Sequence, residues 1–167
     1  MKTIKFFIIV FVFFLLNTSK SFSLIEVDIT RGNLNPLPIA VSPLSQTNKS
    51  KKISQNKLNL KDLGLEIAKV VENNLKQSGL FNPLNKDAFL QKPDIAHLKP
   101  RFEDWSLIKA QALITGKVLI EDDKLKVEFR LWDVLAGREM LALAFTTVPS
   151  NWRRVGHIIT DKVYERL

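Results

Sequence analysis

The clearest hydrophobic periodicity lies in two segments whose apolar residues recur at steps of three and four. The first runs from Leu60 to Leu75, with Asn59 as its predicted N-cap and Gly79 as its predicted left-handed end. The second follows Ser150, which is its predicted N-cap. Its apolar stripe consists of Trp152, Val155, Ile159, Val163 and Leu167. Two amphipathic helices are therefore predicted, one near the middle of the chain and one near its last residues.

Strands are predicted where apolar residues alternate with polar ones or run together between turn residues. The predicted strands are residues 36–44, 81–84, 110–120, 125–132 and 140–148. The last three are separated by short turns at Asp122–Asp123 and Ala136–Gly137, so they are expected to form an antiparallel meander. Because helical segments alternate with these strands, the pattern predicts an α/β fold with a mixed five-stranded sheet flanked by helices.

Two connections contain few apolar residues. Residues 45–57 read as a polar loop, and residues 92–100 read as a connection bounded by prolines. Pro100 is expected in the first turn of a short helix that follows. Trp105 is expected to anchor that helix to the core.

Residues 1–23 have the pattern of a cleavable signal peptide. Lys2 and Lys5 precede eleven unbroken apolar residues, Phe6 to Leu16, and Ser21 and Ser23 form a small-x-small site before Leu24. A membrane-spanning helix needs roughly 20 apolar residues, so a permanent anchor is the weaker alternative. We expect an exported protein that begins near Leu24, with residues 34–167 forming one domain.

The segment that follows the predicted cleavage site alternates with a period of two. Its apolar residues are Ile25, Val27 and Ile29, and its polar residues are Glu26, Asp28 and Thr30. Gly32 and Asn33 then break the run. The pattern is typical of a half-buried strand, and an ordinary edge strand of the domain is one interpretation of it.

The charge and the cysteine content of the chain indicate which kinds of partner and covalent linkage to expect. The formal charge of +8 includes three lysines in residues 1–23, where there is no acidic residue, so residues 24–167 carry +5. The lysines are dispersed and form no long basic run, which argues against nucleic acid as a partner. The chain has no cysteine, so neither disulfides nor lipid attachment at a cysteine is available.

No catalytic or cofactor motif is present in the sequence. His97 and His157 are the only histidines and are isolated from carboxylate clusters, so no metal site is predicted. The six glycines are scattered singly, which excludes a glycine-rich phosphate loop. By exclusion, the sequence predicts a non-enzymatic interaction module without a cofactor or a small-molecule substrate. A small-molecule or peptide carrier is the alternative.

Several stretches, taken together, carry a resemblance to a known family. In order, they are "EVDITRGNLNPLPIAVSPL", "SGLFNPLNKDAFLQ", "LWDVLAGREML" and "NWRRVGHIITDKVYERL". Their order and spacing resemble the N-terminal domain of the TolB family, across essentially all of residues 24–167. The resemblance implies an α/β fold similar to anticodon-binding domains, followed in the family by a β-propeller.

The resemblance also implies a role in the Tol–Pal system of the cell envelope, in outer-membrane integrity, constriction at division and protein transport. Residues 24–33 would then be a docking strand for the periplasmic domain of TolA, with Gly32 and Asn33 as its hinge. With the family in view, we favour this interpretation over an edge strand. The sequence printed ends at Leu167 without a predicted propeller, so binding of Pal is expected only if a propeller is supplied separately.

Overall fold

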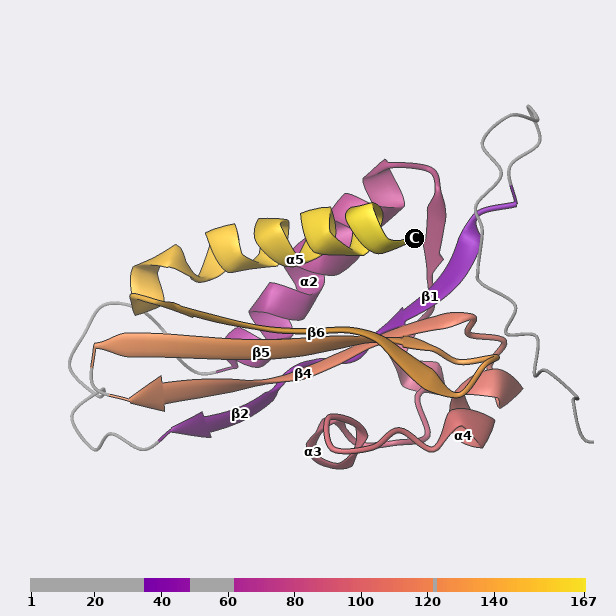
Figure 1. The fold of residues 1–167 in the computed structure, drawn as a ribbon, viewed down its shortest axis with the longest axis horizontal. Helices are drawn as coiled ribbons and strands as arrows, with labels where there is room; N and C mark the ends of the chain where they lie inside the picture. The colour runs from indigo at the N-terminus through magenta and orange to yellow at the C-terminus, as the bar shows by residue number, and fades with distance from the viewer. Residues whose placement is uncertain (1–34, 49–61, 122) are drawn as a thin grey trace, which may run out of the picture.

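A computed structural model describes residues 35–48, 62–121 and 123–167, which form a mixed sheet with helices on both faces (Figure 1). The strands are β1 (Leu37–Val41), β2 (Ser45–Asn48), β3 (Phe81–Pro83), β4 (Ala112–Glu121), β5 (Lys124–Asp133) and β6 (Arg138–Thr147). The α-helices are α2 (Leu63–Gln77), α3 (Pro93–Ala96), α4 (Phe102–Leu107) and α5 (Trp152–Arg166), with 3₁₀ turns η2 (Lys86–Ala88) and η3 (Pro149–Asn151).

The sheet has the order β3-β1-β4-β5-β6, and β2 pairs with β4 beyond the end of β1. β1 is parallel to both β3 and β4, whereas β4, β5 and β6 form the antiparallel meander that the sequence predicts. α2 and α5 cover one face of the sheet, and the chain between β3 and β4 places α3 and α4 on the other (Figure 1). The α/β class is confirmed.

The main core lies between the sheet and the helix pair α2 and α5. Alternate residues of β5 point into it, and Phe129 at the centre of that strand is fully buried. Ile67 of α2 and Ile159 of α5 close the core from above. Complete burial of one such side chain stabilises the fold by about 1.5–3 kcal/mol. A smaller cluster on the opposite face is built around Trp105 of α4, as predicted, and Leu113 of β4.

α2 and α5 approach each other closely because Gly156 has no side chain. A Cβ at Gly156 would lie 2.7 Å from Cγ1 of Val70. The two helices are also joined by the side-chain amide of Asn74, which donates to Thr160 Oγ1 at 3.2 Å. This contact holds α5 against α2, and these are the two amphipathic helices that the sequence predicts.

The predicted N-cap of α2 is wrong. Asn59 lies outside the described residues, and α2 begins at Leu63, with Asp62 as an N-cap that makes no side-chain hydrogen bond. Asp62 has a φ of 69°, a left-handed conformation that a local capping motif would not adopt. Instead, Oε1 of Gln46 accepts the backbone N–H of Gly64 at 3.2 Å. The helix is therefore capped by a side chain from β2.

The described sheet has six strands, so the prediction of five is wrong. Residues 45–48 were predicted to lie in a polar loop, but they pair in parallel with Lys117–Ile120 of β4. Pro43 has no N–H and ends the pairing of β1 with β4, and the chain rejoins the same edge two residues later. β2 therefore forms through main-chain hydrogen bonds to β4, and such bonds depend little on the polarity of the side chains.

Three smaller boundaries also differ. Residues 93–96 form α3 within the predicted proline-bounded connection, and Pro100 precedes Arg101, the N-cap of α4, rather than lying in its first turn. Asn151 rather than Ser150 is the N-cap of α5.

Across the described ranges, no helix reaches the length and apolarity needed to cross a membrane.

Candidate functional site

The predicted docking strand and cleavage site lie outside the described residues. They comprise Ser21, Ser23, Leu24, Ile25, Glu26, Val27, Asp28, Ile29, Thr30, Gly32 and Asn33. The described chain begins at Asn35, two positions before β1. The partner-binding, hinge and cleavage assignments therefore remain predictions, and the surfaces that can be examined belong to the folded domain.

The long outer edge of β6 is one surface suited to binding. Within the described part of the chain no strand pairs with it, so its backbone groups face outward. Leu143 and Phe145 pack against the main core, while Ala142 and Ala144 are exposed on the other face. Near the start of β6, Nε of Arg166 donates to the Met140 carbonyl at 3.1 Å. Such an edge can accept an extended peptide as an added strand.

The exposed part of the sheet opposite α2 and α5 is charged but largely neutralised. Glu128 is paired with Lys126 at 2.8 Å and with Lys117 at 3.1 Å, and Arg130 contacts Glu139 at 3.0 Å. The hydrogen bond from Lys126 lowers the pKa of Glu128, and desolvation partly opposes it. The carboxylate therefore favours folding above its ordinary pKa and loses that contribution as pH falls through the lowered value. Exposed pairs of this kind stabilise little.

An apolar surface lies around α3 and α4. It comprises the exposed side chains Leu90, Ile95, Leu98, Leu107 and Leu135. Leu98 and Leu107 are about three-quarters exposed, at 70% and 74%. All of them except Leu135, which follows β5, belong to the segment between β3 and β4. Scattered exposed leucines are ordinary in a folded domain, but several on one short segment favour contact with another polypeptide.

A small pocket lies beside this apolar surface, at the carboxyl ends of the parallel strands β1 and β3. Its volume is about 200 Å³. The lining residues are Ser42, Pro43, Lys86, Phe89, Gln91, Lys92 and Pro93. Ser42 and Pro43 directly follow β1, and the others belong to the segment that begins at η2. The parallel register of Ile39 with Pro83 brings these two segments together.

Beside Ser42, Gln91 is the buried polar residue in the lining of the pocket. It is 4% exposed, and its Oε1 accepts the backbone N–H of Arg101 and the indole N–H of Trp105, each at 3.0 Å. Because both neighbours are donors, the orientation of the amide is fixed. Nε2 of Gln91 is buried and has no hydrogen-bond partner in the described structure. A buried donor without an acceptor is rare and calls for an explanation.

The two histidines lie in different environments. His157 is exposed on α5, and its Nδ1 is 2.9 Å from Nδ2 of Asn74. His97 is half-buried, and its Nδ1 is 3.3 Å from the Pro93 carbonyl. His157 is therefore a surface residue, whereas His97 is partly buried. Among the described residues, no group of three potential ligands that could hold a metal ion is found.

Sequence reasoning missed the pocket. The one available signal was Trp105, because a buried indole N–H normally finds an acceptor. The sequence does not show which residue supplies that acceptor, since Gln91 lies fourteen positions earlier and is brought to Trp105 by the fold.

The chain is thus a small mixed α/β domain. Its surface presents an open strand edge, exposed apolar side chains and a small pocket, which is typical of a binding domain. The family described as the TolB amino-terminal domain matches residues 25–140. The Tol-Pal system protein TolB of Pelagibacter ubique (strain HTCC1062) is 75% identical over 157 residues, which are 94% of this chain. The chain belongs to the TolB amino-terminal domain family, and its resemblance to that family is confirmed.

Solved structures agree in fold. TolB from Acinetobacter baumannii superposes with a TM-score of 0.60 at 20% identity, covering 78% of this chain and 28% of that one. The lipoprotein GNA1162 from Neisseria meningitidis gives a TM-score of 0.51 at 16% identity, covering 78% and 96%. At these identities, the likeness concerns the fold alone. The chain spans about a third, 35%, of the length of its Pelagibacter relative.

Proposed function

We propose that this chain is a periplasmic protein-interaction module of the Tol–Pal system. Its proposed role is to support outer-membrane integrity, constriction of the outer membrane during division and protein transport, without enzymatic activity. The observation that carries the proposal is the 75% identity to a Tol-Pal system protein over 94% of the chain. Binding of Pal is proposed only where a β-propeller is supplied separately.

The proposed binding element is the segment 24–33, which would dock on the periplasmic domain of TolA. Its apolar face, with Val27 at the centre, would enter side-chain pockets of the partner. Its backbone would add a strand to the partner's sheet, the mode known as β-augmentation. Gly32 and Asn33 suit a hinge, because both residues tolerate backbone conformations that other residues avoid.

The structure of the domain supports a docking element that is separate from the core. The buried residues of the main core all lie between Leu37 and Val163 in the sequence. Its strands and helices complete their apolar pattern within the described residues. Loss of residues 24–33 should therefore cost the domain little stability.

Val27→Asp is expected to abolish most TolA binding while leaving the melting temperature almost unchanged. The substitution removes an apolar side chain from the docking face and adds a charge there. The loss of one buried valine corresponds to about 2 kcal/mol, or a roughly thirtyfold weaker Kd. Titration calorimetry with the periplasmic domain of TolA measures the affinity, and calorimetric melting measures the stability.

Thr30→Asp is the matched control, because it adds the same charge to the polar face of the segment. It should weaken TolA binding much less than Val27→Asp does, because Thr30 belongs to the docking strand but not to its apolar face. Deletion of residues 24–33 should abolish binding in a domain that remains folded. If either change in the apolar face unfolds the domain, and binding follows only the folded fraction, the segment is a structural strand and the docking proposal is wrong.

Export is expected to yield a product that begins near Leu24. The reason is the short apolar run that ends at Leu16, followed by the Ser21-x-Ser23 site. Intact-mass measurement on the periplasmic fraction of an expressing cell should show this product. A full-length species that stays with the inner membrane would contradict both the cleavage site and the periplasmic location.

The carrier alternative receives less support from the pocket. Small-molecule sites usually have volumes of about 300–1,000 Å³. The pocket beside Gln91 has about 200 Å³, which is room for a side chain rather than for a carried metabolite. An interaction module is therefore the better-supported function.

A further inference from the structure

We propose that the outer edge of β6 pairs with the same edge of a second copy of this chain, so that two domains share one continuous antiparallel sheet. The twofold axis of this dimer would stand perpendicular to the sheet and pass beside Ala144. Such a contact is isologous, because the same surface of each copy meets itself. It uses none of residues 24–33 and is therefore independent of the proposed binding of TolA.

Most of this edge is unprotected. β6 has 10 residues, and no described strand pairs with its outer side. Folded proteins usually protect an exposed edge with charges, prolines or a bulge. β6 has such features only at its start, where Arg138, Glu139 and an irregularity in the pairing at Leu131/Trp132 lie. The stretch Leu141–Thr147 that follows contains neither a charged residue nor a proline.

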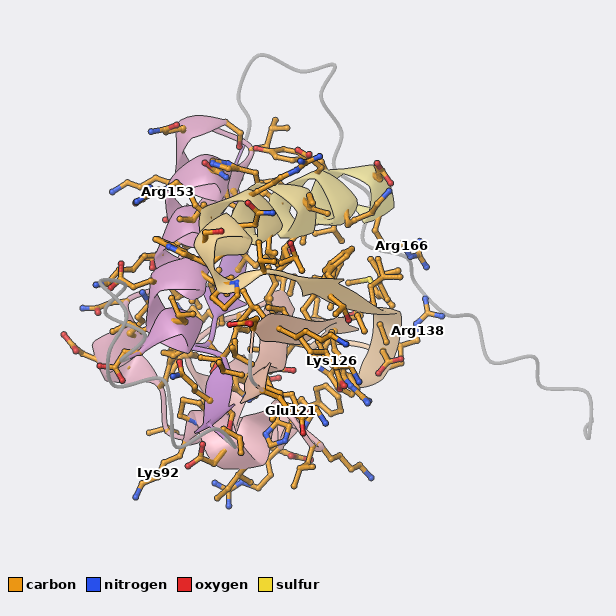
Figure 2. All side chains as sticks on the ribbon, turned by 90° about the vertical axis from the view of Figure 1, so that its left-hand side faces the viewer. Lys92, Glu121, Lys126, Arg138, Arg153 and Arg166 are labelled. Carbon is orange, nitrogen blue, oxygen red and sulfur yellow. The ribbon has the colours of Figure 1, made fainter. Side chains whose placement is uncertain are left out.

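A contact at the start of β6 limits where a second strand can pair. The Met140 carbonyl already accepts the Nε–H of Arg166 at 3.1 Å. Arg166 and Arg138 project on the same side of the molecule, away from α2 (Figure 2). Pairing with a second strand is therefore expected to begin after Met140, which leaves Leu141–Thr147. A symmetric pairing of this stretch with its own copy has Ala144 at its centre.

The side chains of this stretch match when it meets its own copy. On the core face, Leu143 of each copy would lie opposite Phe145 of the other. Both side chains pack on the main core but are only partly buried, so a neighbouring strand would cover them further. On the other face, Ala144 would meet Ala144 of the second copy, and Ala142 would meet Thr146. These three residues are small, exposed and uncharged, so the pairing buries no charge.

The position of α5 favours a second copy over an unrelated peptide. α5 covers β5 and β6 and runs back along β6, because Arg166 in its last turn reaches Met140 (Figure 1). A twofold axis perpendicular to the sheet would therefore place the two α5 helices side by side on one face. Ile158 is about 12 Å along the helix from Arg166, and Ala144 is about 13 Å along the strand from Met140. The axis would thus pass close to both Ala144 and Ile158.

Ile158 is an apolar residue that lies outside the core. It is half-buried and belongs to neither hydrophobic cluster of the described residues. Gly156 and Thr160 face α2 from two positions before and after it, so Ile158 lies on the opposite flank of the helix. In the dimer it would contact Ile158 of the second copy. Lys162 and Glu165 on the same flank pair with each other and bring no net charge. A foreign peptide on β6 would leave Ile158 uncovered.

Sedimentation equilibrium of the chain between about 10 µM and 1 mM tests the proposal. The chain should be monomeric at the lowest concentration and form a dimer, without larger species, as the concentration rises. A dimer is expected because an isologous contact closes at two copies. A chain that stays monomeric throughout, or that forms open-ended aggregates, would overturn the proposal.

Variants at position 144 test the axis. Ala144→Lys would place two like charges on either side of the axis and should abolish the dimer. It should leave the monomer folded, because Ala144 is exposed and its neighbour on β5 is Glu128. Ala144→Glu should likewise be monomeric, and mixing the two variants should restore a dimer, since opposite charges then face each other. Circular dichroism of each variant alone confirms its fold.

Ala142→Lys is the matched control, because it adds the same charge to the same exposed face. Its neighbour in the second copy is Thr146, so it should weaken the dimer much less than Ala144→Lys. Equal effects of these two variants, or no recovery when the Ala144 variants are mixed, would show that the axis does not pass beside Ala144 and that the proposed pairing is wrong.

Ile158→Asn tests the contact between the helices. It should weaken the dimer by at least about tenfold while leaving the melting temperature of the dilute monomer almost unchanged. The reason is that Ile158 belongs to neither hydrophobic cluster. A variant that dimerises like the unmodified chain would show that the α5 helices do not meet, which contradicts the proposed dimer.

Discussion

Gly64→Ala is expected to lower the free energy of unfolding by about 3 kcal/mol, the upper end of the usual cost of overpacking. A Cβ at Gly64 would lie 1.9 Å from the carbonyl oxygen and 2.9 Å from the carbonyl carbon of Leu44. Both are backbone atoms, so no rotation of a side chain can relieve the clash. α2 would have to move away from the end of β1.

Movement of α2 would also break its attachment to the sheet. The Gly64 carbonyl accepts the N–H of Leu44 at 3.2 Å, and the Gly64 N–H donates to Gln46. The gain in helix propensity from glycine to alanine, about 1 kcal/mol, is smaller than the loss. Thermal unfolding should show a melting temperature lower by about 10 °C.

Gly79→Ala is the control for this measurement. Gly79 has a φ of +73° and no atom within 4 Å of an added Cβ. It should cost only the conformational penalty of a left-handed residue, about 1 kcal/mol. If the two variants melt at the same temperature, α2 does not approach Leu44 as closely as described.

Phe129→Ala is expected to cost about 4 kcal/mol of stability, within the range for a fully buried phenylalanine. The ring lies at the centre of the main core with 0% exposure. Its partner on β4 is Gly116, which has no side chain to move into the space. The cavity therefore stays largely open, which places the cost in the upper part of that range. Urea unfolding measures the loss.

Phe145→Ala on the neighbouring strand is the matched control. The Phe145 ring stacks on Phe129 with centroids 6.0 Å apart and an interplanar angle of 12°. It is only partly buried, so its loss should cost about half as much, roughly 2 kcal/mol. Equal losses for the two variants would show that Phe129 is not the central residue of the core.

Elements with a strong local period could be predicted from the sequence. The apolar stripe of α2, which includes Ile67 and Leu75, and the alternation of Leu125 to Leu131 in β5 each occupy one buried face. In both cases, the side chains that define the pattern are the ones that form the core. Local periodicity is then sufficient to place the element.

Elements that depend on distant partners were missed. β2 is polar and exists because β4 offers it an open edge, and the start of α2 is set by Gln46 from eighteen positions earlier. The pocket requires Pro43 beside Phe89, which the parallel pairing of β1 with β3 creates. The predicted docking strand, in contrast, lies outside the described residues.

The contact between α2 and α5 has a consequence for the chain while it is being synthesised. Asn74 meets Thr160, which is made 86 positions later. Until α5 has been synthesised, the part of the core that its apolar face covers stays open to water. The core of the domain is therefore completed only when the last helix of the described chain has been made.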